Sequence, residues 1–235
     1  MHVRARNERG QTRTDWLESY HTFSFGDYQD SRHLQFSDLR VINDDIIQPG
    51  KGFDTHHHRD MEIITYVISG TLAHKDSLGN GSLIRPGDLQ RMTAGTGIYH
   101  SEFNPSDTDP VHLLQIWLLP EQKGLSPSYQ QTAFSQEERR GCWRLLASRD
   151  GRDNSITVHQ DVSLYGTTLP VGAQLGFELA AERKAWIQMA TGVAQLNGQI
   201  LEAGDGAAIE AGETHILMEG LSRESEILLF DLRNT

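Results

Sequence analysis

Three consecutive histidines, His56 to His58, are the first residues in this chain whose types and spacing suggest chemistry. They stand in the stretch GFDTHHHRDME, Gly52 to Glu62. Successive side chains of an extended strand point to opposite faces, so His56 and His58 share one face while His57 points away. Glu62 has the same parity and joins that face if the strand runs regularly so far. The stretch therefore offers two imidazoles, and conditionally a carboxylate, to one side of a predicted strand.

A second pair of possible ligands follows in GTGIYHSEFN, residues 95–104, where His100 and Glu102 are two positions apart. Two such pairs on neighbouring strands of a barrel can converge on one point. Neutral imidazoles and a carboxylate suit Fe(II), Mn(II), Ni(II), Co(II), Cu(II) or Zn(II). A histidine-rich loop by itself is more often simply solvated, and it is the second pair that favours a metal site. Parity alone leaves both Glu62 and Glu102 open as the carboxylate ligand.

The elements that must position these residues have the pattern of β-strands. Short segments of β-type residues are separated by Gly, Pro, Asn and Asp, which is typical of a sandwich or barrel. The strand segments are MEIITYVIS (61–69), TLAHKD (71–76), SLIRP (82–86), DLQRMTA (88–94) and VHLLQIWLLP (111–120). Segment 119–131 is predicted to be a connection, and 134–141 a short helix. The chain is thus predicted to be all-β with few short helices.

The spacing of turn residues in the first half of the chain recurs in the second half, within residues 185–213. The matching pairs are Gly70 and Gly192, Gly87-Asp88 and Gly204-Asp205, and Ala94-Gly95 and Ala211-Gly212. Such internal self-similarity predicts two related β-domains. The offset of 122 residues between Gly70 and Gly192 assigns Glu178 and Ala180 to the positions of His56 and His58. Because His215 stands alone, we expect the second domain to bind no metal.

Composition and charge narrow the classes of function. Hydrophobic residues make up 37% and charged residues 23% of the 235-residue chain, as in globular proteins. A net charge of −11 disfavours contact with a phosphate backbone, so no direct binding of nucleic acid is expected. The one cysteine, Cys142, excludes an intrachain disulfide and a thiolate-rich metal site. Neither a signal peptide nor a membrane span is recognisable, and we expect a cytoplasmic protein.

Several stretches of the first half resemble one known family. The patterns from Gly50 to Glu62 and from Gly97 to Asn104 are similar to the two cupin motifs. The pirin family, particularly its bacterial pirin-like members, is resembled by WLESYHTFSFGDY (16–28), LRVINDD (39–45), THHHRDMEIITYVISG (55–70), AGTGIYHSEFNPS (94–106) and LLQIWLLP (113–120). The resemblance implies a bicupin, in which two jelly-roll β-sandwich or barrel domains pack face to face. We assign residues 1–125 to a metal-binding cupin domain and residues 126–235 to a metal-free one.

The pirin resemblance also implies a ligand set and a catalytic residue. It assigns one divalent metal, with Fe(II) favoured and Ni, Co, Mn, Cu or Zn as alternatives, to His56, His58, His100 and Glu102. Glu102 is in addition the expected general base. Ligand histidines usually donate their other ring N–H to an acceptor, and Asp60 or Glu62 is expected to serve there. Many relatives have proline at the position of His57, a difference that leaves the ligand set intact if His57 faces outward.

The same resemblance implies a reaction. Pirin-like proteins are associated with quercetin 2,3-dioxygenase activity, in which a flavonol is cleaved with O2 and carbon monoxide is released. The expected partners are therefore a flavonol-like small molecule and O2. The alternative is a non-enzymatic, metal- or redox-dependent regulator that acts through protein partners, as pirin itself does with transcription factors. A cupin isomerase or decarboxylase that uses the same metal without O2 is a third hypothesis.

Overall fold

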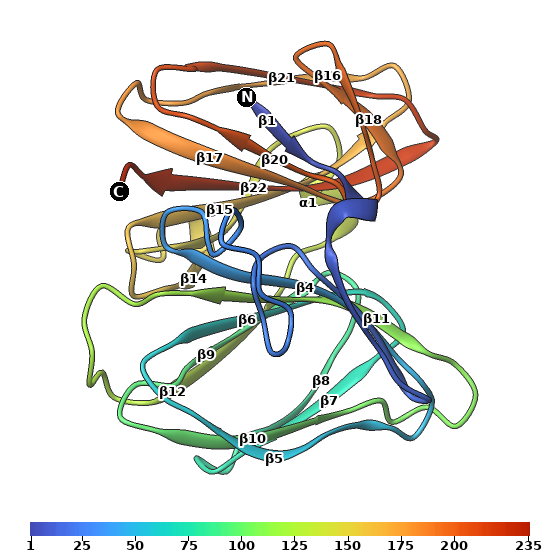
Figure 1. The fold of residues 1–235 in the computed structure, drawn as a ribbon, viewed down its shortest axis with the longest axis vertical. Helices are drawn as coiled ribbons and strands as arrows, with labels where there is room; N and C mark the ends of the chain where they lie inside the picture. The colour runs from blue at the N-terminus through green and yellow to red at the C-terminus, as the bar shows by residue number, and fades with distance from the viewer.

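Alternating strands close into two stacked β-barrels in the computed structural model, which describes residues 1–235 (Figure 1). Each barrel consists of one seven-stranded and one four-stranded sheet. The seven-stranded sheets face each other in the middle of the molecule, and the four-stranded sheets lie on the outside (Figure 1). This arrangement confirms the predicted all-β fold of two jelly-roll domains packed face to face.

The N-terminal barrel is built largely from the first half of the chain. Its seven-stranded sheet has the spatial order β12 (Ser128–Ala133), β9 (Asp88–Thr93), β6 (Glu62–Ser69), β11 (Val111–Leu118), β4 (Leu39–Ile47), β3 (Leu17–His21) and β2 (Gly10–Arg13). Its four-stranded sheet has the order β5 (Gly52–His58), β10 (Ile98–Phe103), β7 (Leu72–Asp76) and β8 (Gly81–Ile84). The predicted ligand residues therefore lie on neighbouring strands, β5 and β10.

The C-terminal barrel repeats this strand order. Its seven-stranded sheet has the order β1 (His2–Arg4), β20 (Gly206–Ile209), β17 (Arg183–Thr191), β22 (Glu224–Arg233), β15 (Val162–Pro170), β13 (Arg144–Ser148) and β14 (Ile156–Thr157). Its four-stranded sheet has the order β16 (Gln174–Glu178), β21 (His215–Gly220), β18 (Val193–Leu196) and β19 (Gln199–Glu202). In this repeat β16 corresponds to β5 and β21 to β10. The repeated topology confirms the prediction of two related β-domains.

Each large sheet ends on a strand supplied by the other part of the chain. β1 pairs with β20, with Val3 opposite Ala207, and β12 pairs with β9, with Gln131 opposite Gln90. Two strands therefore lie on the other side of the predicted division at residue 125. Residues 2–4 belong to the C-terminal barrel, and residues 128–133 belong to the N-terminal barrel. Edge strands pair through backbone hydrogen bonds, which leave no signature in side-chain spacing.

The two faces of each large sheet contribute to different cores. Along β6, Ile63 faces the barrel interior and Ile64 faces the other barrel, as period-two alternation requires. A cluster of 22 buried residues from both halves, including Ile64 and Phe230, fills the space between the barrels. The interior of the C-terminal barrel holds 14 buried apolar residues, whereas the N-terminal interior holds clusters of six and four. The contact between the barrels is thus the largest apolar core.

A short helix in the connection between the barrels holds a buried arginine. α1 (Gln136–Arg139) begins with a capping box formed by Ser135 and Glu138, which confirms the predicted short helix. Arg139 Nη1 donates to the Tyr66 hydroxyl oxygen at 2.6 Å and to Glu226 Oε1 at 2.7 Å. Because Tyr66 lies on β6 and Glu226 on β22, this network links both barrels. The other helical segments are η1 (Arg6–Glu8) and η2 (Arg152–Asn154), and none of the helices has the length and apolarity needed to cross a membrane.

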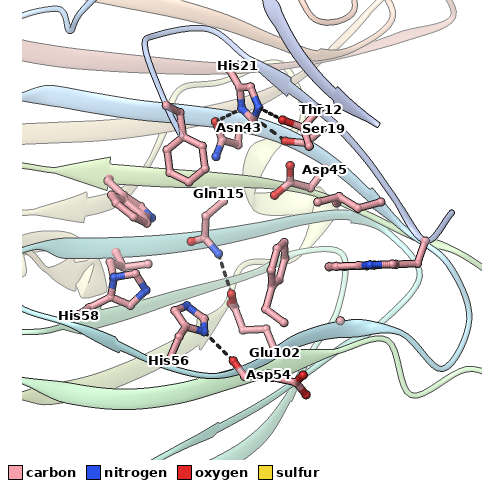
Figure 2. A pocket seen from close by; sticks show the side chains of 17 residues that line it. Thr12, Ser19, His21, Asn43, Asp45, Asp54, His56, His58, Glu102 and Gln115 are labelled. Atoms are coloured by element: carbon pink, nitrogen blue, oxygen red, sulfur yellow. Dashed lines mark hydrogen bonds between the residues drawn. The ribbon is translucent and has the colours of Figure 1, made fainter. Parts of the chain in front are cut away.

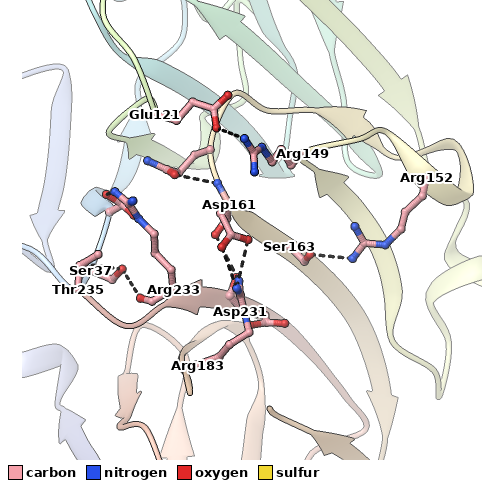
Figure 3. Close-up of polar contacts among 12 residues, drawn as sticks. Ser37, Glu121, Arg149, Arg152, Asp161, Ser163, Arg183, Asp231, Arg233 and Thr235 are labelled. Atoms are coloured by element: carbon pink, nitrogen blue, oxygen red, sulfur yellow. Dashed lines mark hydrogen bonds and ion pairs between the residues drawn. The ribbon is translucent and has the colours of Figure 1, made fainter. Parts of the chain in front are cut away.

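Further polar contacts join the two halves where the barrels meet (Figure 3). Arg149 contacts Glu121, which follows β11, at 2.6 Å. The hydroxyl of Ser37 donates to the main-chain oxygen of Arg233 at 2.7 Å. Exposed ion pairs contribute little individually. The apolar core between the sheets therefore supplies most of the stabilisation of this arrangement.

Candidate metal centre

The consecutive histidines lie on β5, which pairs antiparallel with β10. In this pairing His100 is opposite His56 and Tyr99 is opposite His57. His56 and His58 are partly buried, whereas His57 is exposed and packs on Tyr99 with the ring centroids 4.9 Å apart. The predicted alternation is correct, because His56 and His58 line the barrel cavity while His57 points away from it.

Three imidazoles converge in the interior of the N-terminal barrel. One ring nitrogen from each of His56, His58 and His100 lies within 4.8 Å of the other two. His100 Nε2 is 3.0 Å from His56 Nε2. His56 Nδ1 donates to the main-chain oxygen of Asp54 at 2.7 Å, so its Nε2 keeps a free lone pair. This spacing fits a shared ion, since nitrogen ligands about 2.0–2.1 Å from one metal must lie close together.

The surroundings of His58 and His100 keep these two imidazoles neutral. Burial, followed by the charges of His56 and His74, lowers the pKa of His100 to about 3. Burial, followed by the charges of His100 and His56, lowers the pKa of His58 to about 4. A neutral imidazole presents the lone pair that a metal requires. His58 and His100 can therefore accept a cation at neutral pH without first losing a proton.

Glu102 is held rigidly next to these histidines. Its side chain is 3% exposed, Gln115 Nε2 donates to Oε2 at 2.9 Å, and the Thr65 hydroxyl donates to Oε1 at 3.2 Å. On the facing strand, a Cβ at Gly52 would lie 2.1 Å from the main-chain oxygen of Glu102. Glycine at this position therefore permits the close approach of β5 and β10 that brings the two ligand pairs together.

A fourth histidine, His74 on β7, joins the cluster, although its sequence context does not single it out. β7 flanks β10 on the side away from β5, and His74 lies opposite Glu102. Ligand atoms of His74, His100 and Glu102 lie within 4.8 Å of one another. His74 Nε2 is 3.3 Å from Asp76 Oδ2, while Nδ1 of His74 and Nδ1 of His100 are buried without a partner. Alternation in TLAHKD gives His74 a face, but only the pairing of β7 with β10 gives it this neighbour.

Glu62 and Asp60 do not have the predicted partners. β5 ends at His58, Asp60 has a φ of 50°, and β6 begins at Glu62 in the opposite sheet. Glu62 is fully buried, and its Oε2 accepts from the main-chain nitrogen of His159 at 3.1 Å. Asp60 Oδ1 accepts from the main-chain nitrogen of Gly124 at 2.7 Å. These hydrogen bonds correct the expectation that either carboxylate orients a ligand histidine, because the turn after β5 breaks the parity.

A cavity of about 490 Å³ opens next to the histidines and Glu102 (Figure 2). Four aromatic residues line it: Trp16, Phe25, Phe53 and Trp117. The rings of Trp16 and Phe53 meet edge to face with centroids 5.3 Å apart, and those of Phe25 and Trp117 do so at 5.4 Å. Small-molecule sites typically occupy roughly 300–1,000 Å³ and are mostly apolar with a few polar groups. The cavity has the size and lining of such a site.

The wall of the cavity on the seven-stranded sheet is polar although it is buried. Strand pairing aligns four residues in one row across β3, β4, β11 and β6: His21, Asn43, Gln115 and Thr65. His21 Nδ1 and Asn43 Oδ1 share a hydrogen bond of 2.8 Å, and the Thr12 hydroxyl lies 2.9 Å from His21 Nε2. The row ends at Glu102, to which Gln115 and Thr65 donate (Figure 2 shows the bond from Gln115).

Asp45 lies on β4, one inward position beyond Asn43, and lines the same cavity (Figure 2). Its side chain is 3% exposed, and Oδ1 has no hydrogen-bond partner. Burial raises the pKa of Asp45 to about 7, against a smaller opposite effect of the hydrogen bond from Ser19. The stretch LRVINDD does not indicate which of Asp44 and Asp45 faces the cavity. In the structure Asp44 points to the other face of the sheet and forms an ion pair with Arg9 at 3.0 Å.

The corresponding strands of the C-terminal barrel present apolar residues to the interior. Leu175 and Phe177 of β16, with Ile216 and Met218 of β21, all contribute to the 14-residue cluster or pack against it. Glu178, which the offset of 122 residues equates with His56, instead faces solvent and pairs with His215 at 2.8 Å. Ala180 lies beyond the end of β16. A single offset cannot align all the strands because the turns differ in length. Both groups of potential metal ligands lie in the N-terminal barrel.

Comparison with known families matches both halves of the chain. The family model "Pirin" matches residues 2–118, and the model "Quercetinase C-terminal cupin domain" matches residues 145–232. The chain belongs to the pirin family. A protein named quercetin 2,3-dioxygenase from Escherichia coli K12 is 46% identical over 232 residues, which cover 99% of this chain and 98% of the relative. A putative quercetin 2,3-dioxygenase from Pasteurella multocida is 43% identical over 236 residues and 99% of each chain.

Solved structures of pirins have the same fold. The crystal structure of the bacterial pirin YhhW from Escherichia coli in complex with nickel(II) is 47% identical. It superposes with a TM-score of 0.94 and covers 100% of this chain and 99% of that one. Together with the cluster of histidines and Glu102, this pirin relative supports a metal-binding site of cupin type in the N-terminal barrel. The named relatives support an oxidoreductase of the dioxygenase type.

Proposed function

We propose that this pirin is a metal-dependent dioxygenase that cleaves flavonols such as quercetin with O2 and releases carbon monoxide. The observation that carries the proposal is a cluster of three imidazoles that shares His100 with a second cluster containing the buried Glu102, beside a small-molecule cavity with aromatic walls. The relatives named quercetin 2,3-dioxygenase support the choice of substrate class.

In this proposal one divalent metal is held by four residues, His56, His58, His100 and Glu102. When bound, the metal would supply Lewis acidity for the deprotonated 3-hydroxyl of a flavonol. Fe(II) remains the metal that we favour, and Ni, Co, Mn, Cu and Zn remain alternatives. The nickel(II) complex of YhhW supports a site that accepts a first-row divalent metal.

Glu102 is the general base of the proposed reaction and takes the proton of the flavonol 3-hydroxyl. Its two oxygens are anchored by Gln115 and Thr65, so the carboxylate is orientated before the substrate arrives. A positioned base typically contributes on the order of 10²–10⁴ in rate. Burial at 3% exposure limits the access of water to the carboxylate, which keeps the proton transfer between base and substrate.

The aromatic lining suits a planar, conjugated substrate. Trp117 packs edge to face against His58, with the ring centroids 5.0 Å apart, so one aromatic wall adjoins the ligand histidines directly. Its indole Nε1 is buried without a hydrogen-bond partner. Buried donors of this kind are usually paired. In our proposal this N–H donates to an oxygen of the substrate at the metal end of the cavity.

The alternative of a non-enzymatic regulator accounts less well for the cavity. A protein that works through its surface needs the metal, but it has no need of about 490 Å³ of aromatic-lined space next to the metal. An enzyme needs both. A cytoplasmic location and a small-molecule partner are compatible with this proposal and remain predictions.

The test is the loss of quercetin absorbance with metal-reconstituted protein, under air and without oxygen, with carbon monoxide measured in the headspace. We expect loss that depends on O2 and is accompanied by carbon monoxide. Turnover without O2 would favour an isomerase or decarboxylase, and no turnover with any of the six metals would favour the regulator. His57→Ala should keep one metal per chain, whereas His56→Ala should lose it, because only His56 faces the cavity.

A further inference from the structure

One oxygen of a carboxylate in the cavity is left without a hydrogen-bond partner. Asp45 lines the cavity and is 3% exposed, yet its Oδ1 contacts no hydrogen-bond donor. Buried polar groups in proteins are nearly always paired, and exceptions call for a functional or structural reason. The neighbouring Asn43 and His21 have already satisfied each other through their 2.8 Å hydrogen bond. Among these three neighbours, only Asp45 therefore keeps an acceptor oxygen without a partner.

Asp45 lies a short distance along the sheet from the proposed metal ligands. It lies two residues from Asn43 on β4, and Asn43 is opposite Gln115 on β11. Asp45 is thus a diagonal neighbour of Gln115, at roughly 7–8 Å between Cα atoms. Gln115 in turn donates to Glu102 at 2.9 Å. A rigid ring system that starts at Glu102 can therefore reach Asp45 at its other end.

The surroundings of Asp45 indicate the chemistry of the group it receives. Trp16 and Phe53, whose ring centroids are 5.3 Å apart, line the same cavity and can pack against a planar ring. A carboxylate oxygen requires a donor, and the donor that planar aromatic rings commonly carry is a phenolic hydroxyl. Burial raises the pKa of Asp45 to about 7, which shows that the charged carboxylate is poorly solvated. A bound substrate that displaced the remaining water would add to this cost unless it offered a hydrogen-bond donor.

We propose that Asp45 is a specificity residue that accepts a hydrogen bond from a ring hydroxyl of the substrate at the end remote from the metal. The subsite rests on the proposed function, because it assumes that a flavonol-like molecule occupies the cavity. It adds that the protein selects hydroxylated flavonols over flavonols with bare rings. Sites built to hydrogen-bond a substrate hydroxyl discriminate strongly against analogues that lack it.

The experiment measures binding, so it does not depend on turnover. Protein loaded with Zn(II) is titrated with quercetin and with 3-hydroxyflavone, which has the same 3-hydroxyl and 4-carbonyl but no other hydroxyl. We expect the wild-type protein to prefer quercetin by at least about tenfold in Kd. Asp45→Asn and Asp45→Leu should each reduce this preference by about tenfold. Asp44→Asn is the matched control, since Asp44 is the adjacent carboxylate on the outer face and contacts Arg9.

Thermal unfolding distinguishes a recognition residue from a structural one. A buried carboxylate with one unpartnered oxygen destabilises the folded protein, so Asp45→Leu should raise Tm or leave it unchanged while the preference is lost. A lowered Tm with an intact preference would make Asp45 structural and overturn the subsite. Equal binding of the two flavonols to the wild-type protein would overturn it without any variant, and the proposed function would stand. Failure of both flavonols to bind would overturn the proposed function and the subsite together.

Discussion

The two barrels share one topology but fill it differently. The interior of the C-terminal barrel holds one continuous cluster of 14 buried apolar residues. The N-terminal interior is divided into clusters of six and four, and the polar row and the histidines lie between them. Where the C-terminal barrel has Ile216 and Met218 on β21, the N-terminal barrel has His100 and Glu102 on β10.

In a duplicated fold of this kind, one barrel can supply stability while the other carries the chemistry. Burying His100, Glu102 and Asp45 costs free energy that an apolar interior does not spend. The 22-residue core between the barrels offsets part of this cost. The C-terminal barrel thus supports the N-terminal one through their common interface, and the N-terminal barrel can keep a cavity. Four predictions test this division between the two barrels.

The largest effect is expected from Glu102→Gln. The amide keeps the shape of the side chain but loses the charge and the proton acceptor, so flavonol turnover should fall by on the order of 10²–10⁴ with moderately weaker metal binding. The control is Glu219→Gln on β21, whose carboxylate accepts from Gln174 at 2.9 Å in the other barrel. Turnover is compared only after the metal content of each variant is known. A Glu102→Gln protein with full metal and full activity would contradict the assignment.

The next effect concerns the closed core. Met218→Ala removes a fully buried side chain from the C-terminal barrel and should lower the free energy of unfolding by about 2–5 kcal/mol, with metal content unchanged. Ile63→Ala, which borders the metal-site cavity, should lie at the lower end of that range because the site is already open on one side. Denaturant unfolding of both variants measures the difference. Equal losses would show that the cavity does not loosen its barrel.

A pH-dependent effect is expected at Asp45, whose pKa is raised by burial from 3.8 to about 7. A carboxyl with a raised folded pKa stabilises the folded state fully below about pH 4, and this contribution is lost as the pH rises through about 7. Asp45→Asn should therefore match the wild type near pH 4 and exceed it at pH 8 by on the order of 4 kcal/mol. Unfolding free energies at both pH values, at equal metal content, check this. A constant difference would mean that Asp45 does not titrate in this window.

The smallest effect is expected from Glu62→Gln. Glu62 accepts from His159 in the C-terminal half and not from a ligand histidine, so the loss should appear in stability, at about 1 kcal/mol, rather than in turnover. Melting curves and turnover at equal metal content separate the two outcomes. If Glu62→Gln lost the metal while Glu102→Gln retained it, the site would have the commoner cupin arrangement and the pirin-type ligand set would be wrong.

Much of the fold was predictable because its signals are local. Period-two alternation depends only on neighbours in the chain, so it identified the strands and the outward face of His57. The repeated turn glycines indicated the duplication, which the strand order confirms. The edge strands β1 and β12 escaped prediction because their pairing partners are distant in the sequence.

From the sequence, His56, His58 and His100 could be placed in one candidate cluster with either Glu62 or Glu102 as its carboxylate, because two ligand pairs at strand spacing can converge inside a barrel. Tertiary structure decided the rest. By sequence spacing, both Glu62 and Glu102 could lie on the same strand face as the histidines. The turn at Asp60 instead places Glu62 in the other sheet, where it accepts a hydrogen bond from His159. His74 and Asp45 become neighbours of the site only through the pairing of β7 with β10 and of β4 with β11. Alternation along a strand predicts which face of the sheet a side chain lies on. The order of the strands determines its neighbours on that face, and this order is fixed by contacts between residues far apart in the chain.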